Sequence, residues 1–349
     1  MLKFAHKELV NWLRATDEVE LRRLFSMADD VRRRHVGEAV HLRGLIEISS
    51  HCCRNCSYCG LRALRHITRY RMTREKILSC ARKAVRLGFG TVVLQSGEDF
   101  ALEAGWVADI VRTIKRETDL AVTLSLGERM SDELRLWRDA GADRYLLRFE
   151  TSDADLYAKI HPSLPGRTSD RIAILRQLRD FGYEIGSGVM VGIPGQSYEI
   201  LARDIETFRE LDLDMIGIGP FLAHPDTPLG APGVQNAGAE QVPNTEQMVL
   251  KTVALTRIMC PEANIPSTTA LATVNPMRGR ENGFQSGANV VMPNLTPSPY
   301  RQMYEIYPGK TCVDEEVEQC ARCVRARITC VGREVGVGQG GRQHFEAMA

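Results

Sequence analysis

The sequence predicts an α/β fold: a (βα)8 barrel of the TIM type with an N-terminal helical extension and a small C-terminal extension that contains cysteines. Short β-like runs alternate with longer segments of helical periodicity through the middle of the chain. This alternation is typical of parallel strands joined by right-handed helical crossovers. Eight strands within roughly 250 residues fit a closed barrel better than an open sheet. Because the last two strands have weak patterns, an open or partial barrel is the alternative.

The expected strands are Leu45–Ser49, Thr91–Ser96, Ala121–Leu126, Arg144–Glu150, Ile185–Val191, Met215–Gly219, Ile265–Ala270 and Asn289–Pro293. The expected helices between them are Arg74–Leu87, Trp106–Glu117, Asp132–Ala140, Asp170–Phe181, Tyr198–Leu211 and Gln247–Met259. Glycines such as Gly88, Gly141 and Gly182 follow several of these helices, where a left-handed residue commonly ends a helix. We expect three parts: N-terminal helices over residues 1–40, the barrel over 41–295 and the C-terminal extension over 296–349.

The composition is that of a globular enzyme. Of the 349 residues, 44% are hydrophobic and 26% are charged, a mix that argues against disorder, collagen or a coiled coil. The 45 Lys and Arg nearly balance the 44 Asp and Glu, so the net charge is too small to attract nucleic acid or an anionic membrane. No apolar run reaches the roughly 18 residues that span a bilayer, and the N-terminal segment lacks the apolar core of a signal peptide. We therefore expect a cytoplasmic protein.

Ten cysteines in a cytoplasmic protein require an explanation other than disulfides. Two groups contain most of them: Cys52, Cys53, Cys56 and Cys59, and then Cys312, Cys320, Cys323 and Cys330. The first group directly follows the first expected strand. In a β/α barrel that loop lies at the C-terminal face, where the active sites of this fold assemble.

Three thiolates with the spacing Cys52-x-x-x-Cys56-x-x-Cys59 can each bind a different iron of a 4Fe–4S cluster. The fourth iron is then open to an outside molecule, whereas a cluster that only carries electrons usually has a fourth protein ligand. Structural zinc is one alternative, because His51 or Cys53 could supply a fourth ligand. Chance clustering and the different spacing Cys53-x-x-Cys56-x-x-Cys59 are the others.

The spacing of Cys52, Cys56 and Cys59, with Tyr58 before the last cysteine, resembles the radical S-adenosylmethionine (SAM) superfamily. The resemblance implies that these cysteines hold a 4Fe–4S cluster whose open iron chelates the amino and carboxylate groups of SAM. It also implies that an electron from the cluster breaks the sulfonium carbon–sulfur bond and releases a 5′-deoxyadenosyl radical.

Polar residues at successive strand ends suit the charged groups of SAM. The segment Gln95–Asp99 resembles the Gly-Gly-Glu segment of the superfamily, with Ser96 in place of the first glycine, and Met190–Gln196 resembles the segment that packs against adenine. The resemblance assigns SAM binding to Ser96, Gly97, Glu98, Ser125, Glu150 and Arg171. It assigns the substrate cavity to Arg148, Thr268, Thr269 and Met292, a set that suits small anions. For each residue taken singly, a surface or ion-pair role is the alternative, and only their convergence favours binding.

Longer motifs resemble one biotin synthase-like branch of the superfamily, the HydE family of FeFe-hydrogenase maturases. They include LQSGED at Leu94–Asp99, GIGPFLAHPDTPL at Gly217–Leu229, NIPSTTA at Asn264–Ala270 and the stretch Gly287–Lys310. That family acts with HydG and HydF in assembly of the diiron subcluster of the hydrogenase active site, the H-cluster. The resemblance implies radical attack on an iron–cysteine–carbonyl–cyanide precursor, with an electron donor as a further partner.

The second cysteine group resembles an auxiliary site of the same family. In bacterial members a C-terminal trio binds a 2Fe–2S cluster, and Cys312, Cys320 and Cys323 match that trio. A 2Fe–2S cluster normally takes four protein ligands, so a vacant or zinc-filled site is the alternative. Cys330 is interpreted as a bystander. We expect any cluster here to be dispensable for the chemistry.

Three other functions are left open by the sequence. A methylornithine synthase-like lysine mutase shares this barrel, but it would need charged partners for an amino acid, and Thr268 and Thr269 are neutral. A biotin synthase-like sulfur donor keeps a second cluster inside the barrel, and strands two to eight offer no cysteine for one. A non-catalytic iron–sulfur scaffold or carrier would not cleave SAM.

Overall fold

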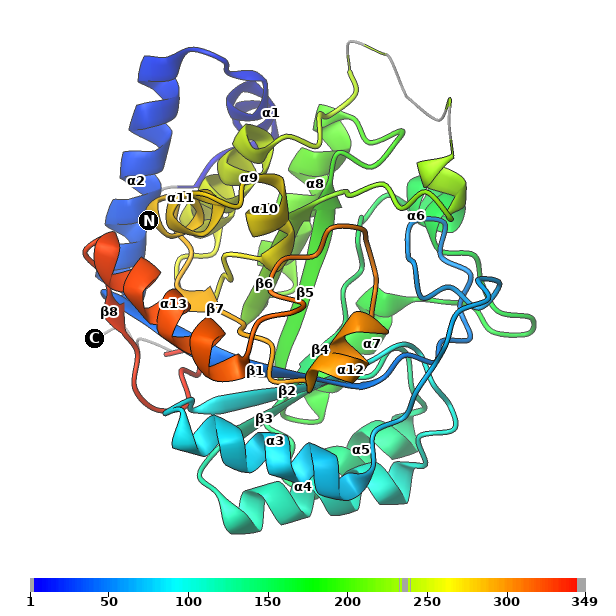
Figure 1. The fold of residues 1–349 in the computed structure, drawn as a ribbon. Coiled ribbons are helices and arrows are strands. Elements are labelled where there is room, and N and C mark those ends of the chain that lie inside the picture. Colours follow the sequence, from blue (N-terminus) through cyan, green and yellow to red (C-terminus); the bar gives the residue numbers. More distant parts are fainter. Residues whose placement is uncertain (1–2, 232, 234–237, 239, 344–349) are drawn as a thin grey trace.

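Two helices, α1 (His6–Arg14) and α2 (Glu18–Val36), precede the sheet in the computed structural model, which describes residues 3–231, 233, 238 and 240–343. Helix α2 begins after Asp17, whose carboxylate accepts hydrogen bonds from the backbone N–H groups of Val19 and Glu20. Figure 1 shows both helices on one side of the barrel, where α2 packs along α9.

Parallel strands form the centre of the molecule in the order β6-β5-β4-β3-β2-β1-β7, and a short strand, β8, pairs with the start of β1. Their bounds are β1 Ala39–Ser49, β2 Thr91–Ser96, β3 Ala121–Ser125, β4 Arg144–Leu146, β5 Glu184–Val191, β6 Met215–Pro220, β7 Val290–Val291 and β8 Glu334–Val335. Because these pairings are parallel, the carboxyl ends of the strands meet at one rim. The predicted α/β fold with a TIM-like barrel is confirmed.

The segment 264–266 closes the ring between β6 and β7 through two isolated bridges. Asn264 pairs with Met215 of β6, and Pro266 pairs with Val290 of β7. Proline has no N–H to donate, so a regular ladder cannot continue through this position.

The predicted strand Ile265–Ala270 is wrong beyond these bridges, because the chain turns into helix α10 (Thr269–Val274). The hydroxyl of Thr268 caps α10 by accepting a hydrogen bond from the N–H of Leu271 at 3.3 Å. Threonine favours this capping position, so the cap outweighs the β-like pattern of the segment.

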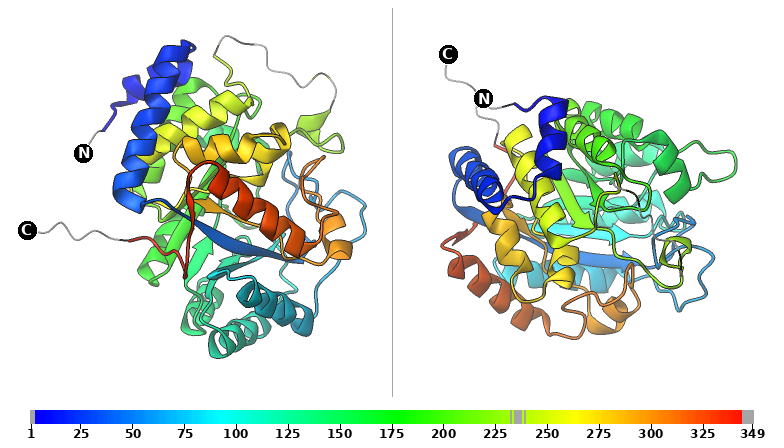
Figure 2. Two further views of the ribbon diagram at one scale, coloured as in Figure 1. Left: turned by 60° about the vertical axis from the view of Figure 1, so that its left-hand side comes forward. Right: turned by 90° about the horizontal axis from the view of Figure 1, so that it is seen from above.

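Helices form an outer layer around the strands, as Figure 2 shows from two sides. Their bounds are α3 Arg74–Arg86, α4 Ala104–Glu117, α5 Ser131–Asp139, α6 Ala154–Ile160, α7 Arg171–Asp180, α8 Tyr198–Glu210, η1 Pro228–Gly230, α9 Glu246–Met259, α10, α11 Gly279–Gln285, α12 Ser298–Gln302 and α13 Val317–Cys330. Every helix that the sequence predicts within the barrel is found, with bounds shifted by at most two residues. The short helices α6, α10 and α11 are additional.

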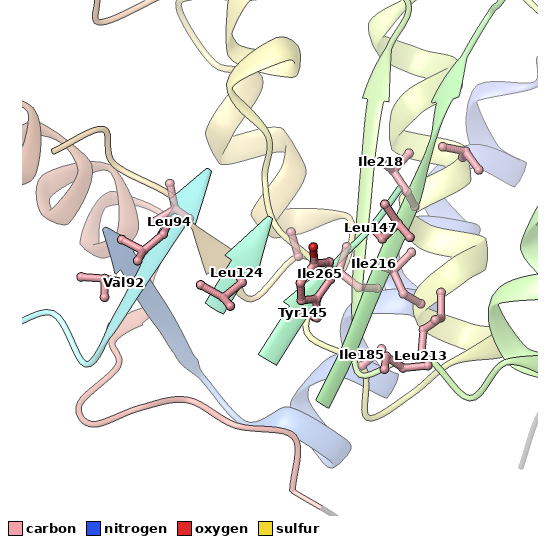
Figure 3. Packing of buried hydrophobic residues seen from close by; sticks show 14 of the residues in the cluster. Val92, Leu94, Leu124, Tyr145, Leu147, Ile185, Leu213, Ile216, Ile218 and Ile265 are labelled. Carbon is pink, nitrogen blue, oxygen red and sulfur yellow. The ribbon is translucent and has the colours of Figure 1, made fainter. Parts of the chain in front are cut away.

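Alternate residues of the strands face opposite sides of the sheet. Val92 and Leu94 of β2 and Leu124 of β3 are fully buried in the apolar cluster of Figure 3. Residues between them, such as Val93 and Thr123, face the other way and line a cavity inside the barrel. Because side chains alternate along each strand, one face packs in the apolar layer that stabilises the fold. The other face lines the interior, which contains the candidate site.

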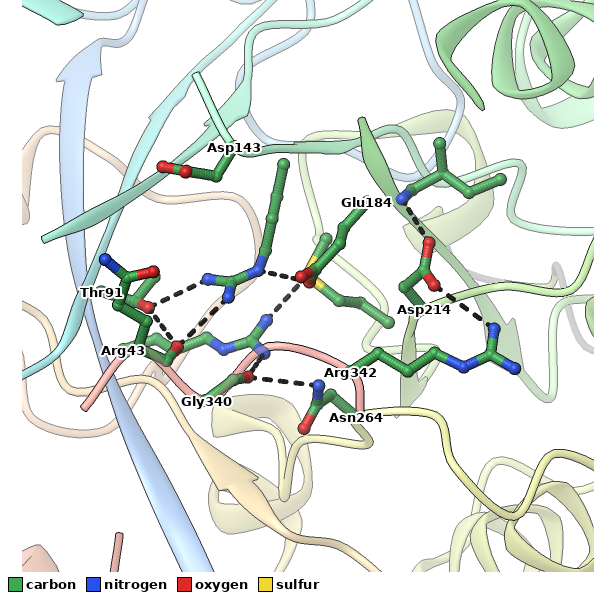
Figure 4. Close-up of polar contacts among 12 residues, drawn as sticks. Arg43, Thr91, Asp143, Glu184, Asp214, Asn264, Gly340 and Arg342 are labelled. Atoms are coloured by element: carbon green, nitrogen blue, oxygen red, sulfur yellow. Dashed lines mark hydrogen bonds and ion pairs between the residues drawn. The ribbon is translucent and has the colours of Figure 1, made fainter. Parts of the chain in front are cut away.

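The C-terminal tail closes the barrel at the amino ends of the strands. After α13 and β8, the backbone oxygen of Gln339 accepts a hydrogen bond from Thr91 at 2.8 Å, and that of Gly340 accepts one from Arg43 at 2.9 Å. Figure 4 shows these contacts at the start of β1 and β2. Among the residues that the structure describes, no helix is long and apolar enough to span a membrane.

Candidate active site

One cavity of about 380 Å³ runs through the barrel interior from the cysteine loop. It brings together every residue that the sequence analysis assigns to the cluster, to SAM and to the substrate. These residues are Cys52, Cys56, Cys59, Ser96, Gly97, Glu98, Ser125, Arg148, Glu150, Arg171, Thr268, Thr269 and Met292. They come from seven different strand ends or loops, so the tertiary fold gathers what the sequence separates.

The cysteine loop follows β1 and presents three of its four thiols to this cavity. Cys52, Cys56 and Cys59 line it, whereas Cys53 and His51 do not. The Cys53 sulfur lies instead 4.0 Å from a carboxylate oxygen of Glu98. The placement therefore favours the spacing of Cys52, Cys56 and Cys59 over the alternative that begins at Cys53, and over zinc with a fourth ligand from His51 or Cys53.

The three thiols are poor acids before any metal binds. Burial raises the pKa of Cys52 and of Cys56, and burial followed by the neighbouring Cys52 raises the pKa of Cys59 to about 12. Metal ligation requires the thiolate, so binding here must release protons and is stabilised by the charge of the metal. All ten cysteines of the chain are free thiols, and these three converge on one space. This donor set fits a 4Fe–4S cluster with three protein ligands.

Two glycines allow the SAM segment to lie close to the cysteine loop. A Cβ on Gly97 would lie 2.3 Å from the backbone oxygen of His51 and 2.7 Å from Cβ of Cys52. Gly127, after β3, has a φ of 76°, and a Cβ there would lie 2.7 Å from Cγ of Glu98. Any side chain at either position would push the Ser96–Glu98 segment away from the cysteines.

A chain of buried charges surrounds the cavity mouth. Arg54 donates to Glu98 at 2.7 Å and to Glu128 at 2.8 Å, and Glu128 also accepts from Arg171 at 2.9 Å. The side chains of Arg54, Glu98 and Glu128 are each less than a tenth exposed. The two assigned residues, Glu98 and Arg171, are thus joined by two that the sequence analysis did not assign. The sequence contained a signal for both, because Arg54 lies inside the cysteine loop and Glu128 lies three residues after the end of β3.

His161 holds the other side of Arg171. Its Nε2 lies 2.6 Å from a terminal nitrogen of Arg171, and its ring stacks on Tyr157 with centroids 5.0 Å apart. Burial, followed by the charges of Arg171 and Arg54, lowers the pKa of His161 to about 2, so the ring is neutral and Nε2 accepts the hydrogen bond. No sequence pattern pointed to His161, which ends the additional helix α6.

Arg148 and Glu150 form a pair within the cavity wall. Two guanidinium nitrogens of Arg148 lie 3.0 Å from the two carboxylate oxygens of Glu150. Glu150 has a φ of 63°, in the left-handed region that non-glycine residues rarely adopt. The structure therefore links a residue assigned to the substrate with one assigned to SAM.

The C-terminal extension supplies part of the deep cavity wall, which the sequence analysis did not assign. Tyr304, Tyr307 and Lys310 line the cavity beside Met292. The ammonium group of Lys310 pairs with Glu47 of β1, whose side chain is 1% exposed. Within this pair, each buried charge is compensated by the other.

In the second cysteine group, Cys312 and Cys320 lie close together. The sulfurs of Cys312 and Cys320 and a carboxylate oxygen of Glu315 lie within 4.8 Å of one another. Cys323, one turn further along α13, is exposed and lies outside this group. A hydrogen bond from the neighbouring Cys320 lowers the pKa of Cys312, which favours the thiolate that a metal would require.

Comparison with known proteins identifies the class and the family. The family model of the radical SAM superfamily matches residues 46–220, which run from β1 to the end of β6. FeFe-hydrogenase maturase subunit HydE of Thermotoga maritima is 48% identical over 93% of this chain and 90% of its own length. A parallel barrel with three thiols at its cavity is, with this match, a radical SAM enzyme. The chain belongs to the radical SAM superfamily and, within it, to the HydE family of FeFe-hydrogenase maturases.

Two other similarities are more distant. The 3-methylornithine synthase of Methanosarcina barkeri is 30% identical over 88% of this chain and 83% of its own length. The crystal structure of methylornithine synthase PylB superposes with a TM-score of 0.81 and 25% identity over 96% of this chain and 95% of that one. The structure of HydG from Carboxydothermus hydrogenoformans has a TM-score of 0.77 at 19% identity, over 94% of this chain and 75% of that one, and shows a common fold.

Proposed function

We propose that this enzyme cleaves SAM in the barrel cavity and directs the resulting radical at an iron–cysteine–carbonyl–cyanide precursor of the H-cluster. HydG would supply that precursor, HydF would receive the product, and a separate donor would supply the electron. The observation that supports the proposal is the continuity of one cavity from Cys52, Cys56 and Cys59 to Arg148, Thr268, Thr269 and Met292. When held by the three cysteines, a 4Fe–4S cluster supplies the electron that breaks the sulfonium bond.

The protein side chains would bind and orient SAM. A guanidinium has five N–H donors, and Arg171 uses Nε and one N–H on each terminal nitrogen for Glu128, His161 and the backbone oxygen of Arg148. The remaining donors can hold the SAM carboxylate. The Ser96–Glu98 segment, Ser125 and Glu150 would accept from the ammonium and ribose groups. Enclosure by the barrel keeps water and stray hydrogen donors from the radical.

The auxiliary site is proposed as a 2Fe–2S centre on Cys312, Cys320 and Cys323. The closeness of Cys312 and Cys320 supports it, whereas the exposed Cys323 would have to turn inward. A role outside the chemical step is supported because none of these cysteines lines the barrel cavity.

The test is to reconstitute the protein without oxygen, reduce it with dithionite and follow 5′-deoxyadenosine. The HydG product or lysine is then added. We expect SAM cleavage in both cases and consumption of the HydG product only. Consumption of lysine would favour a methylornithine synthase-like mutase, and absence of any cleavage would favour a non-catalytic iron–sulfur carrier.

A further inference from the structure

A buried carboxylate behind the cavity wall, Asp204 of α8, connects two strand ends. The proposed function assigns Glu150 at the first to SAM, and the Met190–Gln196 loop at the second resembles the segment that packs against adenine. Its side chain is fully buried, and none of the ion pairs among the described residues includes it. It does not line the cavity. A carboxylate this deeply buried requires several hydrogen bonds in place of water.

One oxygen of Asp204 holds the residues that follow β4. It accepts from the backbone N–H of Ser152 at 2.6 Å, from the Ser152 hydroxyl at 2.7 Å and from the Thr151 hydroxyl at 3.3 Å. These residues directly follow Glu150, which has the strained left-handed backbone. Such a conformation persists only where the surroundings fix the residues beside it.

The other oxygen of Asp204 holds the loop that follows β5 through Gln196. It accepts from the amide nitrogen of Gln196 at 3.3 Å. That amide also donates to the backbone oxygen of Met190 at 3.1 Å, and its oxygen accepts from the N–H of Gly192 at 2.7 Å. Met190 lines the cavity, as Glu150 does. A single carboxylate is therefore bonded to both loops.

We propose that Asp204 is a positioning residue that fixes Glu150 and the Met190–Gln196 loop together for SAM binding. The inference rests on the proposed role of Glu150 at SAM. All four partners of Asp204 donate hydrogen, so only an acceptor satisfies them. In Asp204→Asn one oxygen still accepts from Ser152, but the new NH₂ group faces the NH₂ group of Gln196, and the coupling to the β5 loop is lost.

The experiment compares the reconstituted holoenzyme with Asp204→Asn and with Glu210→Gln, a matched control on the exposed face of the same helix. SAM affinity is measured by equilibrium dialysis of SAM against the oxidised holoenzyme, which has no electron with which to cleave it. Hydrogen exchange of residues 150–152 and 190–196 is measured on the same samples. We expect roughly tenfold weaker SAM binding and faster exchange in both loops for Asp204→Asn, in the range typical of groups that orient ligand-binding residues. The control should show neither change.

Unchanged exchange in both loops would overturn the coupling. Faster exchange with unchanged SAM affinity would also overturn the inference if Glu150→Gln weakens SAM binding. If Glu150→Gln also leaves SAM binding unchanged, Glu150 does not bind SAM, and the proposed function is wrong at this residue. Ser152→Ala removes only one donor, so it repeats the test if Asp204→Asn does not fold, and it should loosen the β4 loop more than the β5 loop.

Discussion

The two ends of the barrel both contain buried arginines, but those at the amino ends also bind the backbone of the C-terminal tail. At the carboxyl ends of the strands, Arg54 and Arg171 pair with Glu98 and Glu128 and line the cavity. At the amino ends, Arg43 and Arg144 donate to backbone oxygens of the C-terminal tail. The first end keeps charged groups beside a space that a ligand can enter, and the second uses them to close the barrel.

The closed end shows how the chain stabilises itself with its own backbone. Burial, followed by the nearby charge of Arg144, lowers the pKa of Arg43 to about 9. Arg144 donates to Glu184 at 2.6 Å and to Thr91 at 3.0 Å. Arg342 of the tail pairs with Asp214, at the start of β6. At the amino ends, backbone oxygens of the tail accept the hydrogen bonds of the arginines. At the carboxyl ends, a bound ligand would accept such bonds.

A buried arginine therefore need not indicate a ligand-binding site, because it can instead bind the chain's own backbone. Substitutions at the carboxyl end should reduce ligand binding with little loss of stability, and substitutions at the amino end should do the reverse. Substitutions at the two ends and at the cysteine sites can test this division.

Cys56→Ala should abolish SAM cleavage, because two thiols cannot hold a cluster with one open iron. Production of 5′-deoxyadenosine and iron content per chain are the measurements. Cys53→Ala is the matched control in the same loop, since its sulfur does not line the cavity, and it should retain activity. Equal activity of both variants would refute the assignment of the cysteines.

Arg171→Gln should weaken SAM binding by roughly 10- to 100-fold, because the charged guanidinium and its hydrogen bonds are replaced by a shorter, neutral amide. Equilibrium binding of SAM to the oxidised protein, which has no electron with which to cleave it, measures the effect. Arg176→Gln, an exposed residue of the same helix, serves as the control. If the two variants bind SAM equally well, Arg171 is only structural.

Arg144→Leu should lower the free energy of unfolding by about 2–4 kcal/mol and leave SAM affinity unchanged. The substitution leaves Glu184 and the Gln339 carbonyl without their buried donor. Urea unfolding under anaerobic conditions measures the first quantity. Arg22→Leu removes an exposed pair with Glu18 and should change stability by no more than about 0.5 kcal/mol. A loss of SAM affinity in Arg144→Leu would contradict the division between the two ends.

Cys320→Ser should have the smallest effect on the reaction. Iron bound at the C-terminal site should fall, because one of two adjacent thiols is removed, while SAM cleavage continues at the rate of the unchanged protein. Iron analysis and 5′-deoxyadenosine production measure both. Complete loss of cleavage would show that the auxiliary site takes part in the chemistry.

Most of the barrel could be predicted from the sequence, because helices and strands have different hydrophobic periods. The strand Ile265–Ala270 could not, since Thr268 caps a helix that a β-like pattern conceals. At the candidate site, residues in recognisable motifs, such as Cys52 and Glu98, were assigned in advance. His161 and Asp204 were not, because each acts through a partner and belongs to no motif of its own.

The three-cysteine loop and the alternation of strands and helices can be recognised in the sequence, because both depend on residues a few positions apart. Only the tertiary structure decided which distant segments meet. Arg43 and Gly340 are 297 positions apart and hydrogen-bonded, and Lys310 reaches Glu47 across 263 positions. Such contacts form when packing and the burial of polar groups favour one arrangement of the whole chain, and no local pattern encodes that balance.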